Sequence, residues 1–163
     1  MINCTLKMGR IRRALFSLAA GCVLVGGYAA TAQQVQPVSP DLTPKLRELL
    51  RKEMLSIEDG SKQILSHLIA GEDANVAEVA QQIHDSFILQ QSMTPEDKQD
   101  LMAAVPEDFV TRDRAFHALS ADLAQAARDG DRSAQHEKFG QMIETCTACH
   151  ALYATDRFIE LAE

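Results

Sequence analysis

Cysteine is scarce in this chain, and what there is lies toward its two ends. Of four cysteines in 163 residues, Cys4 and Cys22 fall within the first 32 residues, and Cys146 and Cys149 lie near the C-terminus. A second Cys or His pair with the spacing of a four-ligand zinc site is missing, and so is the βαβ pattern that a thioredoxin-like couple needs. If residues 1–32 are removed, no structural disulfide remains, so the apolar core has to stabilise the chain alone.

Positive charge is also in short supply beyond residue 32. Residues 33–163 hold 12 Lys and Arg against 23 Asp and Glu, a net charge of −11. A surface of this sign repels nucleic acid and anionic membranes, so we expect neither as a partner. It suits a soluble protein that meets a basic patch on another protein.

The first 32 residues have the pattern of a secretory signal peptide. Four basic residues precede an apolar run from Ala14 to Ala29, and Ala30-Thr31-Ala32 matches a cleavage site. The run is short for a membrane span, so we expect cleavage after Ala32, export to the periplasm and no stable membrane insertion. The residues before Cys22 resemble a lipoprotein signal whose Leu stands one position too far upstream, which makes lipidation of Cys22 an alternative.

Strand-like alternation is absent from the sequence, and apolar residues instead recur three and four apart, as in amphipathic helices. Residues 33–43 are expected to form an extended leader. Helices are expected from Thr43 to Gly71, with Gly60 weakening the middle, and then from Asp73, after Thr94-Pro95, from Pro106 to Gly130 and from about Asp131. Four long helices with short connections predict an all-α fold, an antiparallel up-down-up-down four-helix bundle over residues 44–163.

Five residues near the C-terminus, Cys146-Thr147-Ala148-Cys149-His150, form the motif that attaches a c-type haem. Residues three and four apart share one face of a helix, so Cys146 and Cys149 present two thiols side by side, matching two vinyl groups on one porphyrin edge. His150 follows directly and can ligate the iron from the proximal side. A disulfide between the two cysteines would be strained within a helix. The segment therefore predicts a covalently attached haem c on the last helix.

With this motif on the last helix, Tyr153 three residues after it and Arg51 in the first helix, residues 44–158 resemble cytochrome c′ and its low-spin relatives, the class II cytochromes c. The resemblance implies a haem set between the helices, an Arg51 that approaches a haem propionate, and two copies that can pair through the first two helices. The sequence departs from the family at Ala154, where relatives carry Arg or Lys, and the next basic residue is Arg157. That departure weakens any gas chemistry that needs a basic group beside the proximal ligand.

The residue on the far side of the iron decides between two functions. At a rise of 1.5 Å per residue, the depth of His150 in its helix points to Met54 and Leu55 in the first helix. Met54 is central on the apolar face, at the height where relatives of the cytochrome c-556 type supply a thioether ligand. Leu55 fits the apolar residue that blocks the iron in five-coordinate relatives. One residue of register separates the two.

We expect Met54 to ligate the iron and the protein to carry single electrons to and from periplasmic redox partners. The alternative is a five-coordinate cytochrome c′ that binds NO or CO. No nucleophile–base pair is legible, so no enzyme is expected. His84 and His117 are expected at the core boundary, bonded to solvent or carboxylates, and a bis-histidine haem remains a further alternative. Phe87 and Tyr153 are expected to pack in the core or against the haem.

Overall fold

The computed structural model describes residues 36–85 and 92–161. The chain divides into two compact units, residues 1–32 and 33–163, and every described residue belongs to the second. The expected signal peptide and Phe87 lie outside the described residues. Within the part that is described, the regular structure is helical and contains no strand, and none of its helices has the length and apolar character to cross a membrane.

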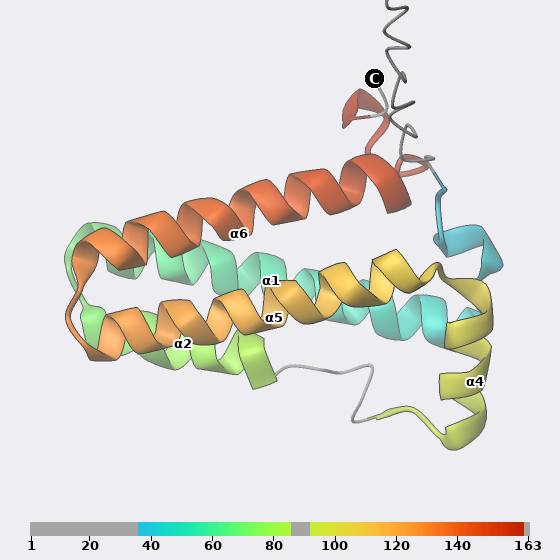
Figure 1. The fold of residues 1–163 in the computed structure, drawn as a ribbon, viewed down its shortest axis with the longest axis horizontal. Coiled ribbons are helices and arrows are strands. Elements are labelled where there is room, and N and C mark those ends of the chain that lie inside the picture. Colours follow the sequence, from blue (N-terminus) through green and yellow to red (C-terminus); the bar gives the residue numbers. More distant parts are fainter. Residues whose placement is uncertain (1–35, 86–91, 162–163) are drawn as a thin grey trace, which may run out of the picture. The chain divides into compact units, whose positions relative to one another are not determined.

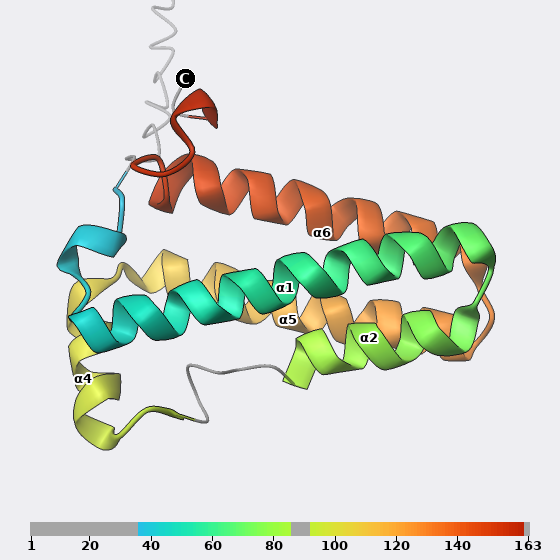
Figure 2. The ribbon, with the colours of Figure 1, turned by 180° about the vertical axis from the view of Figure 1, so that it is seen from behind.

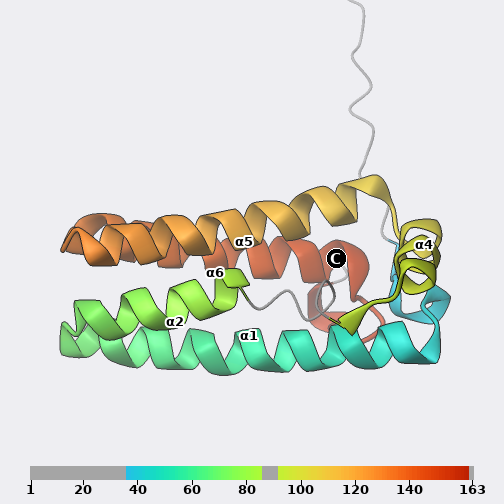
Figure 3. The ribbon, with the colours of Figure 1, turned by 90° about the horizontal axis from the view of Figure 1, so that it is seen from below.

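The described helices form the expected antiparallel four-helix bundle. Its members are α1 (Pro44–Ala70), α2 (Asp73–Asp85), α5 (Glu107–Arg128) and α6 (Arg132–Tyr153). In the packing order, α1 lies on α2, α2 on α5 and α5 on α6, and successive members run in opposite directions (Figures 1 and 2). The short α4 (Pro95–Ala104) lies across the end where α1 and α5 begin and α6 ends (Figure 3).

Local capping interactions set the helix bounds where the sequence placed them. The Thr43 hydroxyl accepts a hydrogen bond from a backbone N–H in the first turn of α1, and Gly71 ends that helix with φ +70°, a conformation that favours glycine. Thr94 and Asp97 exchange hydrogen bonds in a capping box at the start of α4. The Asp131 side chain caps α6. These contacts span a few residues each, which is why the sequence alone predicts them.

The buried apolar side chains form two clusters along the bundle. The central cluster joins α1, α2, α5 and α6, and its largest buried members are Ile57, Ile64, Val76, Ile83, Phe116, Leu123 and Met142. The end cluster lies beside α4 and is formed by Val38, Leu42, Leu46, Val105, Phe109 and Tyr153. The haem motif on α6 lies where the two clusters adjoin, because Cys146 packs against the central cluster and Cys149 against the end cluster.

The expected extended leader is a packed part of the bundle domain. It contains a 3-10 turn, η1 (Ser39–Asp41), and its Val38 and Leu42 are buried in the end cluster. The backbone N–H of Gln36 donates to the carbonyl of Leu152 at 2.8 Å, and another leader N–H bonds to the end of α6. The leader thus holds the C-terminal end of the helix that carries the haem motif.

Gly60 has a packing role that its effect on helix propensity does not reveal. It is buried on α1, and a Cβ atom added there would lie 3.0 Å from Cδ1 of Ile83 on α2. Because glycine lacks this atom, the two helices can approach closely at this point. The cost of glycine to α1 is therefore offset by its contact with α2.

Candidate haem site

The two motif cysteines lie on α6 at the junction of the apolar clusters. Both are free and half-buried. Cys146 packs against the central cluster, and Cys149 packs against the end cluster. Burial raises the pKa of both thiols, that of Cys149 to about 11, with the nearby Asp113 carboxyl adding to the shift. A thioredoxin-like couple needs a lowered thiol pKa, so the raised pKa values of these cysteines do not favour that chemistry.

His150 follows on the same helix and is half-buried near the end of α6. Burial lowers the pKa of its imidazole, and the positive charge of Arg157 lowers it further. Neutral imidazole is the form that binds iron, so the surroundings of His150 favour ligation. Arg157, seven residues after the histidine, is thus the basic residue whose charge reaches His150.

The two distal candidates on α1 differ in what they face. The expected central position of Met54 on the inward face of α1 is wrong, because the buried residue there is its neighbour Glu53. Met54 is half-buried and packs against the central cluster, which also contacts Cys146. Leu55 is 43% exposed. Of the two residues, Met54 is thus the one that reaches the core, and its thioether sulfur is a ligand suited to haem iron.

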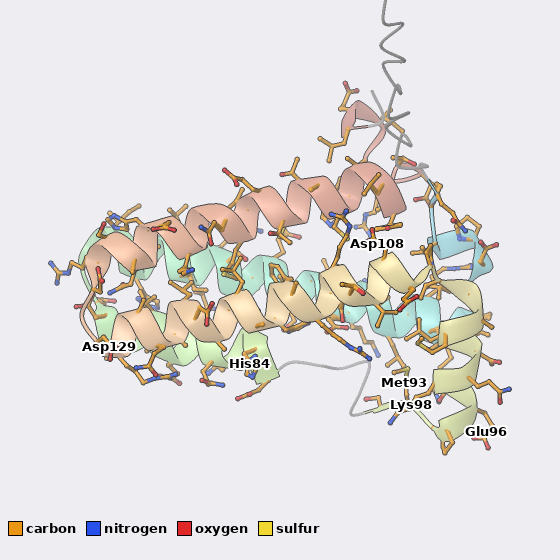
Figure 4. The ribbon with its side chains drawn as sticks, in the orientation of Figure 1. His84, Met93, Glu96, Lys98, Asp108 and Asp129 are labelled. Atoms are coloured by element: carbon orange, nitrogen blue, oxygen red, sulfur yellow. The ribbon has the colours of Figure 1, made fainter. Side chains whose placement is uncertain are left out.

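Two other residues expected near the haem make protein contacts in the described structure. The Arg51 guanidinium forms a two-pronged pair with Glu48, at 2.8 and 2.9 Å, on the exposed side of α1. Tyr153 is buried, and its hydroxyl donates to Asp108 at 2.6 Å, a residue at the start of α5 (Figure 4). Its ring also packs edge-on against Phe109. These contacts leave the expected roles of Arg51 and Tyr153 toward a haem untested.

The histidines of α2 and α5 link those two helices. The His84 Nδ1–H donates to the carbonyl of His117 at 2.9 Å, and the His117 Nδ1–H donates to the carbonyl of Ile83 at 2.9 Å. His117 is 1% exposed, so the expectation of a boundary position is wrong for this residue, although its expected carboxylate partners are present. The bonds to backbone carbonyls give both side chains a structural role.

The sequence analysis missed a fully buried carboxylate, that of Glu53, which has no exposed surface. Its Oε1 lies 3.4 Å from Nε2 of His117, and Asp113 Oδ1 lies 3.8 Å from the same nitrogen. We call these residues the buried charge cluster. The spacing of the inward positions 46, 50, 53, 57, 60 and 64 alternates between four and three, and this alternation was the signal that places Glu53 and Gly60 inside.

The cluster changes the protonation of two of its members. Burial raises the pKa of Asp113 to about 6, Glu53 adds to the rise, and His117 opposes it. Burial by itself lowers the pKa of His117, but the hydrogen bond to Glu53 and the charge of Asp113 outweigh it, and the net change is a raised pKa. Both raised pKa values mean that Asp113 and His117 hold their protons to a higher pH inside the bundle than in water.

The residues present fit a covalently attached haem. Two half-buried thiols on one helix face can form the thioethers, and a neutral imidazole follows them directly. A thioether packs on the cluster that Cys146 touches. The apolar residues on both sides of the motif suit the porphyrin face.

A four-helix bundle with Cys-x-x-Cys-His on its last helix defines a c-type cytochrome of the helical-bundle class. The family model described as Cytochrome C′ matches residues 49–154, and the chain belongs to this family, as the resemblance predicted. A search of curated proteins and a search of solved structures each gave no match. Family membership indicates a monohaem c-type cytochrome with haem c covalently bound.

Proposed function

We propose that this protein is an exported, periplasmic carrier of single electrons whose haem iron is ligated by His150 and Met54. The haem supplies the one-electron chemistry. Cys146 and Cys149 hold it by two thioether bonds, and His150 holds the iron on the proximal side. The two apolar clusters exclude water from its faces, and burial together with a thioether ligand raises the reduction potential.

The contrast between Met54 and Leu55 carries the proposal. Met54 is half-buried and packs against the cluster that Cys146 touches, while Leu55 is 43% exposed. An apolar blocking residue has to face the iron, and the exposed position of Leu55 does not favour that role. Met54, whose side chain carries the thioether, is therefore the better candidate for the sixth ligand of the haem iron.

The charge of the chain supports a docking partner of opposite sign. After cleavage at Ala32, the net charge is −11, and opposite charges steer redox partners together at rates that depend on salt. We propose a basic surface on the redox partner. We propose a carrier and not an enzyme, because the residues named here attach the haem or ligate its iron.

Met54→Leu tests the proposal. The two side chains are close in size, so the bundle should keep its core volume. Loss of the thioether should convert a low-spin haem to high-spin, lower the reduction potential and open the ferrous iron to rapid carbon monoxide binding. Optical spectra, redox titration and stopped-flow mixing measure these three changes.

Leu55→Ala is the matched control on the neighbouring position and should leave spin state and potential unchanged. If Met54→Leu leaves both as in the parent protein, Met54 is core packing. A parent iron that is already high-spin would then establish the alternative, a five-coordinate cytochrome c′ that binds NO or CO. A low-spin parent would instead point to a second histidine, His84 or His117.

A further inference from the structure

His150 is held in an unusual way for a histidine that ligates a metal. Such a residue normally donates its second ring N–H to a carboxylate or a carbonyl, and this bond fixes the plane of the ring. Within residues 36–85 and 92–161, no hydrogen bond reaches either ring nitrogen of His150. A contact with another side chain is therefore the candidate for fixing its plane.

That contact is with Phe158. The two rings are parallel to within 6° and their centroids are 4.3 Å apart, the geometry of aromatic stacking. The Arg157 guanidinium carbon lies 5.9 Å from the centroid of the Phe158 ring, within the range of a cation–π contact. Phe158 thus has the imidazole and a positive charge as neighbours.

A tight turn after α6 places Phe158 there. The backbone N–H groups of Arg157 and Phe158 both donate to the carbonyl of Ala154, at 3.0 and 2.9 Å, and the N–H of Ala154 donates back to the carbonyl of His150 at 3.1 Å. The backbone N–H of Leu161 then donates to the carbonyl of Phe158 at 3.0 Å and continues the turn. The stacking ring is therefore supplied by backbone hydrogen bonds that start at the histidine itself.

We propose that Phe158 is the positioning residue for the proximal ligand, fixing the plane of the His150 imidazole by stacking and covering its outer face. An imidazole bound to iron stands edge-on to the porphyrin and can rotate about the iron–nitrogen bond. A parallel ring against its face blocks this rotation. Without a carboxylate or carbonyl acceptor from the described residues, the imidazole also keeps less negative charge than one that donates to such a group, which favours ferrous iron. The proposal rests on the proposed function: His150 ligates the iron, and Met54 keeps the ferric iron low-spin, so that its g values report the imidazole plane.

The test uses the holoprotein and three substitutions at position 158. Phe158→Ala removes the ring, Phe158→Leu keeps apolar volume without a flat face, and Phe158→Tyr keeps the ring. Low-temperature electron paramagnetic resonance of the ferric protein reports the imidazole plane through the g values. We expect one sharp set of g values in the parent and in Phe158→Tyr, and shifted or broadened sets in Phe158→Ala and Phe158→Leu.

The reduction potential provides a second measurement. It should fall in Phe158→Ala, because water reaches the proximal face and Arg157 loses its platform. Ile159→Ala is the control, since Ile159 is the next residue and is 70% exposed; it should behave like the parent. The proposal is overturned if Phe158→Ala and Phe158→Leu keep the g values of the parent, or if Ile159→Ala shifts them as far. A chain without bound haem would instead refute the proposed function, and haem staining separates the two failures.

Discussion

At the scale of single residues, the buried charge cluster links the packing of the bundle to pH. Glu53 and His117 are both buried, and removal of charged groups from water costs several kcal/mol unless they are paired. The cluster offsets this cost by holding protons, as the raised pKa values of Asp113 and His117 show. A proton held on Asp113 or His117 changes the charge of the cluster inside the bundle.

The raised pKa of Asp113 predicts a pH-dependent stability. Its pKa is about 6 in the folded chain, above the ordinary model value of 3.8, so its stabilising contribution is present at pH 4 and is lost as pH rises through 6. The raised pKa of His117 acts in the same direction at higher pH. The free energy of unfolding of the parent, minus that of Asp113→Asn, should fall by roughly 1–2 kcal/mol between pH 4 and pH 7.

Urea unfolding of the holoprotein at several pH values measures this difference. Asp122→Asn is the control, because Asp122 lies on the same helix with its side chain exposed, and it should leave the pH dependence of the parent unchanged. A difference that stays constant or rises with pH would show that the cluster does not favour protons.

At the scale of the helices, α1 shows how one face serves two purposes. Its inward positions bury apolar side chains at 46, 57 and 64, yet the same register places Glu53 and Gly60 inside. Gly60 lets α2 approach closely, and Glu53 meets the histidine of α5. A helix whose inward face followed apolar periodicity alone would have neither Glu53 nor Gly60 at these positions.

Gly60→Leu tests the close approach of α1 and α2. The added side chain has to displace Ile83 and Val79, which lie 3.0 and 3.5 Å from the first added atom. Overpacking of this kind costs about 1–3 kcal/mol, and a gain in helix propensity of up to about 1 kcal/mol offsets part of it. Denaturant unfolding should therefore show a net loss of stability.

Gly140→Leu is the matched control on α6, where an added Cβ meets nothing within 4 Å. There the gain in propensity should act alone, and the variant should be as stable as the parent or slightly more so. Equal effects of the two substitutions would show that the space around Gly60 is not tight.

At the scale of the whole bundle domain, the haem motif lies where the apolar interior divides. Cys146 contacts the central cluster and Cys149 the end cluster, so a porphyrin attached to both would join the two regions into one core. The haem is then a part of the fold as well as a cofactor, in the way that metal binding couples to folding elsewhere.

The variant with both Cys146→Ser and Cys149→Ser tests this coupling. It should carry no haem on a denaturing gel stained for haem. Its helices should persist in far-ultraviolet circular dichroism, while its thermal melting becomes broad and its tertiary packing loose. Haem that stays on the denatured variant would refute attachment through Cys146 and Cys149, and sharp melting like that of the holoprotein would show that the two clusters are stable without it.

Much of this protein follows from its sequence by itself. Thr43, Gly71, Thr94 and Gly130 mark helix ends because caps and left-handed turns depend on neighbours only a few residues away. The haem motif is legible for the same reason, since the two cysteines and the histidine that we propose to hold the haem lie within five consecutive residues. The apolar periodicity predicted the bundle, and the family match agrees with the resemblance that the motif indicated.

Only the tertiary structure decided the surroundings of the ligands. The burial of Glu53 depends on His117, which is distant in sequence, and the leader reached the end of α6 across more than a hundred residues. The stacking of Phe158 on His150 depends on a reversal of the chain that no periodic pattern announces. Helix ends and the motif are set by local bonds, whereas burial, protonation and ring orientation depend on which distant segments meet, and the packed bundle alone determines that.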